Sequence, residues 1–320
     1  MIDESNQSRK ATRCLSSALG LTKVIIREEK EIEMLNKIYC GDNLEFMHSL
    51  PDECIDLIYI DPPLFSNRNH KVVLGDEVLS FGVKWDDFQH YLTWMSERLK
   101  EMHRILKTTG SIFLHQEAYQ LRFKMDKIFG ENNFRNIIIW HPPTPKTFVP
   151  GIIVEFEEIL FYTKSQEHTF NPQYEKKISP RYEKLKHLVD EDNLLKYKNV
   201  KTVSPKLIEP ILKAQKLRLG RDLEDDDIIY DFGDFITNCW ELPSVKRNSK
   251  ENLNYPTQKP EALLERIIKA STNKGDIVFD PFCGCGTSLA VAKRLGMQFV
   301  GIDINPIACK ISNERISCLK

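Results

Sequence analysis

Residues 277–303 have the sequence IVFDPFCGCGTSLAVAKRLGMQFVGID, and the pattern of this stretch indicates the fold class. It begins with the short apolar run 277–280 and passes through a glycine-rich turn into an amphipathic segment, residues 289–295. A second apolar run, residues 298–303, ends in the acid Asp303. A strand, a glycine-rich turn, a helix and a strand with a terminal acid are typical of one half of a nucleotide-binding α/β fold.

The glycine-rich turn differs from the turn that binds dinucleotides. A dinucleotide fingerprint has the pattern GxGxxG, whereas this turn has the pattern DPFxGxGT and lacks the third glycine. Glycines let the backbone approach a ligand closely, and an acid about twenty residues further on can bind ribose hydroxyls. The turn therefore favours a cofactor without a pyrophosphate and argues against a dehydrogenase.

A second motif, Asp61-Pro62-Pro63-Leu64, directly follows the apolar run 55–60. β-Branched apolar residues stopped by Asp and two prolines predict a buried strand that ends in a rigid loop. The prolines fix their own φ and hold each preceding residue extended, so the Asp61 carboxylate has a set direction. Ligands bind at the carboxyl ends of strands in open α/β sheets. Taken alone, the motif also fits an ordinary acid at the end of a strand.

Together these motifs resemble the amino-methyltransferases of DNA, which use S-adenosyl-L-methionine. Their order is the β-type order, with the DPP motif first, a target-recognition region next and the FxGxG motif last. The resemblance runs from about Met34 to the C-terminus. It includes Cys40-Gly41-Asp42-Asn43, the run 110–115, and Tyr255-Pro256-Thr257-Gln258-Lys259-Pro260. It implies a Rossmann-like α/β fold with a mostly parallel sheet and an inserted target-recognition region.

The resemblance also divides the chain into four parts. We expect an N-terminal extension (1–33), a catalytic half (34–165), a target-recognition region (166–254) and a cofactor-binding half (255–320). Within the catalytic half, apolar residues spaced by three or four predict an amphipathic helix over residues 86–106. Residues 108–110 would end this helix, a strand is expected over 111–115, and a second helix is expected over 119–129.

The resemblance assigns roles to individual residues. The catalytic set would be Asp61, Pro62, Pro63, Leu64 and Phe65, with the Asp61 carboxylate and the Pro62 carbonyl accepting hydrogen bonds from the target amine. Asp280 and the turn would hold the methionine part of the cofactor, Asp303 its ribose and Asp42 its adenine. Thr257 and Lys259 would reach the methionine carboxylate or the groups that support it. The full cofactor set is Asp42, Thr257, Lys259, Asp280, Pro281, Phe282, Gly284, Gly286, Thr287 and Asp303.

The implied reaction is methyl transfer to N6 of adenine in a specific sequence of double-stranded DNA, after the base is flipped out of the stack. Asp rather than Ser at position 61 favours adenine, and an N4-cytosine enzyme is the alternative. Most relatives have an aromatic residue where this chain has Leu64, so a weakly active or inactive DNA-binding relative is a further alternative. Phe65 can take over stacking on the flipped base if the loop shifts.

Charge is distributed unevenly along a chain of 320 residues whose formal net charge is only −1. Residues 176–221 carry thirteen Lys and Arg against five Asp and Glu, and residues 222–234 carry seven acids and no base. A basic block of this length can neutralise several phosphates, which favours DNA binding within the target-recognition region. A solvated surface is the alternative explanation.

The eight cysteines form no CxxC pair, so we expect no metal site. Unpaired cysteines and the lack of a long apolar run indicate a cytoplasmic protein that does not enter a membrane. A restriction endonuclease partner would be a separately encoded protein. The sequence leaves open whether the protein is a monomer or a homodimer.

Overall fold

The computed structural model describes residues 34–63, 65, 70–74, 77–81, 84–116, 119–142, 155–175, 188, 194–200, 208–209, 212–213, 215–216, 221–225, 228–231 and 234–319. The chain divides into two compact units, Pro172–Thr237 and the remainder. The predicted extension 1–33 and Leu64 lie outside the described residues, as does most of the basic block 176–221.

Within the described residues, the larger unit is built on an eight-stranded sheet in the order β1-β14-β13-β2-β5-β7-β6-β12. The strands are β1 (Lys37–Cys40), β2 (Ile55–Ile60), β5 (Leu106–Gln116), β6 (Phe134–Trp140), β7 (Glu157–Thr163), β12 (Cys239–Trp240), β13 (Ile277–Asp280) and β14 (Gln298–Asp303). Strands β1, β14, β13, β2 and β5 are parallel, whereas β7 is antiparallel to both of its neighbours. The predicted mostly parallel α/β fold is confirmed.

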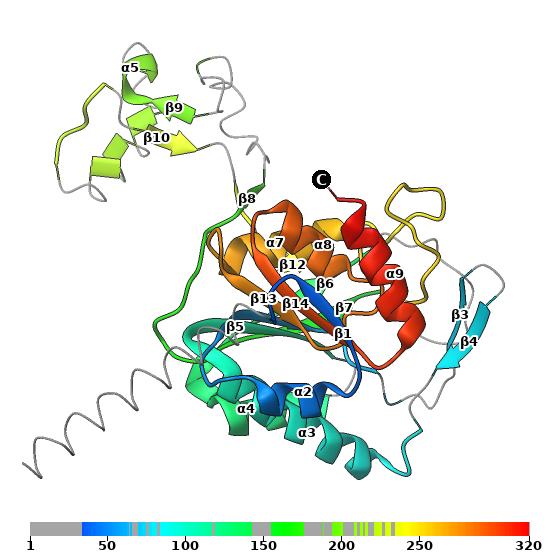
Figure 1. The fold of residues 1–320 in the computed structure, drawn as a ribbon. Coiled ribbons are helices and arrows are strands. Elements are labelled where there is room, and N and C mark those ends of the chain that lie inside the picture. Colours follow the sequence, from blue (N-terminus) through cyan, green and yellow to red (C-terminus); the bar gives the residue numbers. More distant parts are fainter. Residues whose placement is uncertain are drawn as a thin grey trace, which may run out of the picture. The chain divides into compact units, whose positions relative to one another are not determined.

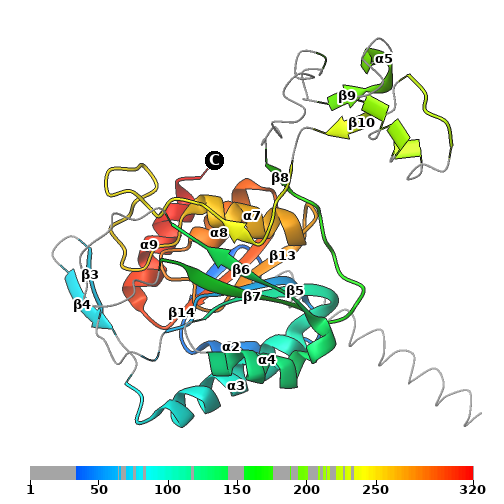
Figure 2. The ribbon, with the colours of Figure 1, turned by 180° about the vertical axis from the view of Figure 1, so that it is seen from behind.

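Helices cover both faces of this sheet (Figures 1 and 2). One face carries α2 (Asn43–Ser49), α3 (Phe88–Ile105) and α4 (Tyr119–Phe129), and the other carries α7 (Glu261–Ser271), α8 (Thr287–Arg294) and α9 (Pro306–Ser317). Parallel strands that are covered on both faces are apolar along their whole length. Accordingly, Ile55, Leu57, Ile58 and Ile60 of β2 are all fully buried.

The predicted helices lie where the apolar spacing places them. Helix α3 begins after Asp87, whose side chain caps it by accepting a hydrogen bond from the amide of His90 at 2.7 Å. It buries Met95, Leu99 and Met102 on one stripe. Helix α4 has the predicted bounds, residues 119–129. Both helix predictions are confirmed.

Strand β5 is longer than predicted, because it begins at Leu106 instead of residue 111. The pairing of β5 with β2 shifts in register over this stretch. Gly110 permits the irregularity, since a Cβ there would lie 2.9 Å from the carbonyl oxygen of Asp56. The residues predicted to end the helix, 108–110, lie within β5 instead, because α3 already ends at Ile105.

The remaining described elements are short. A hairpin of β3 (His70–Leu74) and β4 (Glu77–Phe81) follows the Asp61-Pro62-Pro63 motif, and a 3₁₀ turn occupies Glu131–Asn133. In the smaller unit, β8 (Tyr174–Glu175) pairs with β11 (Asp234–Phe235), β9 (Leu194–Lys196) pairs with β10 (Ile228–Asp231), and α5 spans Tyr197–Val200. The predicted bounds of the target-recognition region, 166–254, stay a prediction. In the described ranges, no helix is long and apolar enough to cross a membrane.

Candidate active site

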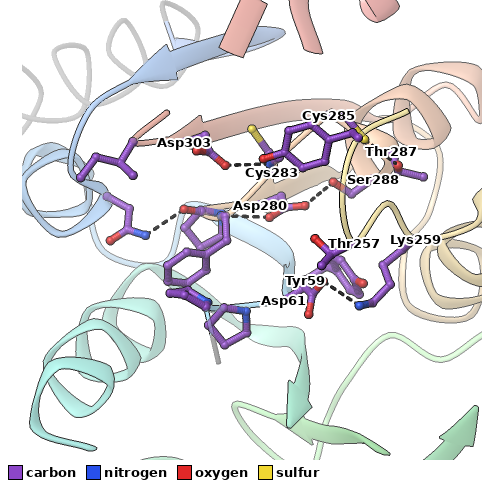
Figure 3. A pocket seen from close by; sticks show the side chains of 18 of the residues that line it. Tyr59, Asp61, Thr257, Lys259, Asp280, Cys283, Cys285, Thr287, Ser288 and Asp303 are labelled. Atoms are coloured by element: carbon purple, nitrogen blue, oxygen red, sulfur yellow. Dashed lines mark hydrogen bonds and ion pairs between the residues drawn. The ribbon is translucent and has the colours of Figure 1, made fainter. Parts of the chain in front are cut away.

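Four acids stand in a row at one edge of the sheet. Asp280 and Asp303 end β13 and β14, while Asp42 and Asp61 closely follow β1 and β2. These four strands are parallel neighbours, so their carboxyl ends meet at the same edge. All four acids line one cavity of about 300 Å³. Figure 3 shows three of them, Asp61, Asp280 and Asp303. The topology of the sheet therefore assembles the site.

The cavity brings together most of the predicted site residues. Those that line it are Asp42, Asp61, Pro62, Pro63, Thr257, Lys259, Asp280, Pro281, Phe282, Gly284, Thr287 and Asp303. Gly286 and Phe65 are not part of the lining, and Leu64 lies outside the described residues. Lining residues that the sequence did not predict include Asn43, Tyr59, Trp94, Arg98, Tyr255 and Ser288.

The glycine-rich turn has a backbone shape that requires glycine. Gly284 and Gly286 have φ values of +50° and +72°, in the left-handed region. A Cβ on Gly286 would also collide with the hydroxyl of Ser312 in α9. The carboxylate of Asp303 accepts a hydrogen bond from the Gly284 amide at 2.9 Å. This bond fixes the turn after β13 against the end of β14.

Asp280 is buried beneath the same turn, with 3% of its surface exposed. Its carboxylate accepts hydrogen bonds from the Phe282 amide, at 3.0 Å, and from the Ser288 hydroxyl (Figure 3). Burial raises the pKa of Asp280 to about 7, because these two hydrogen bonds only partly offset the lost hydration. Burial likewise raises the pKa of Asp303, against the opposing effect of two backbone amides. Asp280 is thus partly protonated near neutral pH.

Asp42 ties the cavity to two helices. Its Oδ1 caps α2 by accepting a hydrogen bond from the Leu44 amide at 2.7 Å, and its Oδ2 lies 2.7 Å from Nη2 of Arg98. Arg98 also donates to Oδ1 of Asn43, at 2.8 Å. The side-chain amide Nδ2 of Asn43 in turn donates to the backbone carbonyl of Pro281, at 2.8 Å. This chain of hydrogen bonds joins the segment after β1 to the turn after β13.

Arg98 has a sequence signal that our predictions did not use. It lies three residues after Met95 and four before Met102, so it falls on the apolar stripe of α3. An arginine in such a position needs a buried partner. Here Arg98 pairs with Asp42, and its guanidinium carbon lies 3.8 Å from the ring centroid of Trp94. Both Trp94 and Arg98 thereby line the cavity.

Asp61 is paired with a partly buried lysine, Lys259 (Figure 3). Nζ of Lys259 lies 2.8 Å from Oδ2 of Asp61 and 3.3 Å from Oε2 of Glu157. The same oxygen of Glu157 lies 3.3 Å from Nδ1 of His115. Glu157 begins β7 and His115 lies near the end of β5, so two central strands hold this network. From the sequence, no role was assigned to Glu157 or to His115, the last residue of the run 110–115.

Opposing effects set the charges in this network. Burial alone would raise the pKa of Glu157, but His115 and Lys259 lower it to about 2. Burial, followed by the charge of Lys259, lowers the pKa of His115. Burial would lower the pKa of Lys259, yet Asp61 and Glu157 raise it above its ordinary value. At neutral pH, Glu157 is therefore ionised, Lys259 is charged and His115 is neutral.

Two features of the cavity wall are typical of a site shaped for a ligand. Tyr59 is 3% exposed, and its hydroxyl has no hydrogen-bond partner among the described residues. Buried hydroxyls without partners are uncommon in proteins. Thr257 has a φ of +62°, a strained conformation for a β-branched residue. An unpaired hydroxyl and a strained backbone beside one cavity favour a binding role over a purely structural one.

Phe65 packs in an aromatic cluster at the start of α3. Its ring centroid lies 5.0 Å from that of Phe88 and 6.0 Å from that of Tyr91. It is 41% exposed and does not line the cavity. The stacking of Phe65 on a flipped base therefore stays a prediction.

The buried carboxyl of Asp280 predicts a pH-dependent stability. Its pKa is about 7 in the folded protein and 3.8 ordinarily, so the stability that protonated Asp280 contributes is complete below pH 4 and lost as the pH rises to about 7. Asp280→Asn does not titrate. We expect this variant to match the wild type near pH 4 and to exceed its free energy of unfolding above pH 7, by on the order of 1–4 kcal/mol.

Urea unfolding of both proteins between pH 4 and 8 measures this difference. Glu265→Gln, which removes an exposed carboxylate from α7, is the control and should show no comparable trend with pH. A difference between Asp280→Asn and wild type that stays constant from pH 4 to 8 would contradict the raised pKa of Asp280.

Solved structures with a similar fold are DNA methyltransferases. A putative DNA modification methylase from Thermus thermophilus, complexed with S-adenosyl-L-methionine, has a TM-score of 0.50 and 20% identity, over 88% of this chain and 93% of that chain. The cytosine-N4-specific PvuII DNA methyltransferase has a TM-score of 0.53 and 16% identity, over 87% of this chain and 85% of that chain. At these identities, the similarity establishes the fold alone.

Sequence comparison identifies the family. The type II methyltransferase M.BglII of Bacillus subtilis is 29% identical over 295 residues, which are 88% of this chain and 69% of that protein. The DNA adenine methyltransferase YhdJ of Escherichia coli K12 is 29% identical over 290 residues, which are 86% of this chain and 81% of that protein. The family model for the N6 and N4 DNA methylases matches residues 55–314. The chain therefore belongs to this family of DNA methylases.

Proposed function

We propose that this DNA methylase transfers a methyl group from S-adenosyl-L-methionine to N6 of adenine in a specific sequence of double-stranded DNA. The observation that carries the proposal is the single cavity in which Asp61, of the DPP motif, lies beside the glycine-rich turn. The target atom lies within the base stack of the duplex, so the base must be flipped into this cavity. The DNA adenine methyltransferase YhdJ is among the relatives that support the choice of adenine.

The cofactor is S-adenosyl-L-methionine, and the residues around the turn suit it. Gly284 brings backbone to the cavity wall, because a Cβ there would press on the ring of Tyr255 at 3.2 Å. The carboxylate of Asp303 faces the same cavity and can accept hydrogen bonds from ribose hydroxyls. The unpaired hydroxyl of Tyr59 offers a further hydrogen bond. When bound, the cofactor supplies an electrophilic methyl group.

The chain's own task is to prepare the amine. The lone pair of an exocyclic amine is delocalised into the ring of the base, which makes the nitrogen a poor nucleophile. The Asp61 carboxylate and the Pro62 carbonyl accept its two hydrogens and favour the form in which the lone pair is localised on the nitrogen. Proline has no N–H that competes for this contact. Such fixed acceptors act where positive charge develops in the transition state.

DNA recognition falls to the region 166–254 in this proposal. The basic block 176–221 supports it through the phosphates that its lysines and arginines can neutralise. A separately encoded restriction endonuclease is the second partner that we propose, since several relatives are named type II methyltransferases. The oligomeric state is left open between monomer and homodimer.

Cofactor binding tests the turn directly. We expect Gly284→Ala to weaken the binding of S-adenosyl-L-methionine by about tenfold or more, because the new methyl strains the turn and presses on Tyr255. Gly275→Ala is the matched control. Gly275 also has a positive φ, of +92°, but nothing lies within 4 Å of its added Cβ. Calorimetry that finds equal affinity in the two variants would remove the turn from the cofactor site.

Methyl transfer tests Asp61. We expect Asp61→Ala to bind S-adenosyl-L-methionine with an affinity close to that of the wild type and to transfer methyl groups more slowly by about a hundredfold or more. The acceptor for the amine is then missing, while the glycine-rich turn is intact. Calorimetry and tritium transfer to unmethylated plasmid DNA measure the two properties. Transfer at the wild-type rate would show that another group orients the amine.

The methylated nucleoside in the product DNA identifies the target base. Mass spectrometry of nucleosides from DNA methylated by the wild type should detect N6-methyladenine. Detection of N4-methylcytosine alone would overturn the choice of adenine and leave the amino-methyltransferase reaction in place.

A further inference from the structure

We propose that Lys259 and Glu157 are positioning residues that hold the Asp61 carboxylate for the target amine. This inference rests on the proposed function. It moves Lys259 from the cofactor side of the cavity, where the sequence placed it, to the amine side. It also gives a role to Glu157, which the sequence did not predict.

The backbone of the DPP motif does not fix the Asp61 carboxylate by itself. The prolines set the backbone, but the terminal torsion of an Asp side chain has a broad and shallow preference. The contact of Lys259 with Oδ2 of Asp61, at 2.8 Å, removes this freedom. Oδ1 is then the oxygen that would accept a hydrogen from the amine. The lysine thus selects one orientation of the acceptor.

Glu157 in turn holds the ammonium group of Lys259 in place. Nζ of Lys259 lies between Oδ2 of Asp61 and Oε2 of Glu157, and its side chain is only 14% exposed. Glu157 is in contact with Nδ1 of His115, whose side chain is 4% exposed. Glu157 lies in β7 and His115 in β5, so strands of the main sheet hold the carboxylate that contacts Lys259.

The charges in this network also suit the reaction. Lys259 alone would cancel the charge of Asp61 and weaken its attraction for an amine that becomes positive. Glu157 restores a net charge of −1, since His115 is neutral. A negative network beside the amine stabilises the charge that develops as the nitrogen is methylated. Lysine therefore orients Asp61, and Glu157 preserves the electrostatic effect of Asp61.

Removal of the lysine should change how the rate depends on pH. The ionisable groups that face Asp61 are Lys259, Glu157, His115, Tyr59 and Asp280. Of these, Lys259 is the cation at neutral pH, so Lys259→Met removes the positive charge that lies 2.8 Å from Asp61. We expect this loss to move the acid limb of the profile, where the rate falls at low pH, to higher pH. A residue that only supports packing would lower the rate without moving the acid limb of the profile.

The experiment measures single-turnover transfer of tritiated methyl groups to plasmid DNA from a host without DNA methyltransferases, between pH 5 and 9. For Lys259→Met, we expect a rate at least about tenfold below the wild type and an acid limb about one pH unit higher. The dissociation constant for S-adenosyl-L-methionine, measured by calorimetry, should stay within about twofold. Lys259→Arg should recover part of the rate.

Two further variants separate positioning from folding. Lys107→Met removes a comparable ion pair, with Asp56 at 2.8 Å, near the opposite end of β2, and should leave the rate unchanged. Glu157→Gln keeps the shape of the site but removes the negative charge that holds Lys259. We expect it to lower the rate by about threefold or more without moving the acid limb upward. This variant keeps the proposal testable if Lys259→Met does not fold.

Three results would overturn the proposal. The first is a wild-type rate in Lys259→Met or in Glu157→Gln. The second is a fall in cofactor affinity for Lys259→Met with a wild-type rate at saturating cofactor, which would return Lys259 to the cofactor side. The third is a lower rate with an unmoved acid limb in folded Lys259→Met. A wild-type protein that binds the cofactor and methylates no DNA would instead contradict the proposed function.

Discussion

The site depends on the crowding of four carboxylates at one edge of a parallel sheet. Asp42, Asp303, Asp280 and Asp61 follow or end four neighbouring strands, so the sheet order alone places them side by side. Like charges in a partly buried cavity repel one another and lose hydration. Each carboxylate therefore needs partners that stabilise its charge, or a proton that removes it, and the four acids differ in which of these they have.

Each of the four acids has a different set of partners. Asp42 pairs with Arg98, and Asp303 accepts backbone amides from Gly284 and Asn305. Asp280 has no cation against it in these contacts and instead holds a proton more tightly. Asp61 is paired with Lys259, which comes from the C-terminal part of the chain. The four acids therefore differ in how their charge is stabilised, and in the function that we propose the first three belong to the cofactor side of the cavity and Asp61 to the amine side.

Sequence reasoning found the acids because each one follows or ends an apolar run, which is a local pattern. It also found the glycine-rich turn, whose positive φ values require glycine at positions 284 and 286. It assigned no role to Glu157 or His115, because their contact joins two strands that lie far apart in the sequence. Arg98 was detectable as a charge on an apolar stripe. The partner of Lys259 was not, because Asp61 lies almost two hundred residues away in the sequence.

A crystal structure with S-adenosyl-L-methionine bound would test whether one cavity holds both the cofactor and the amine. The quantity to measure is the position of the sulfonium methyl carbon relative to Asp61. We expect the ribose at Asp303, the methionine part beside the turn at Gly284, and the methyl carbon directed toward Asp61 with room for an amine between them. A cofactor bound outside this cavity, or a methyl carbon directed away from Asp61, would contradict it.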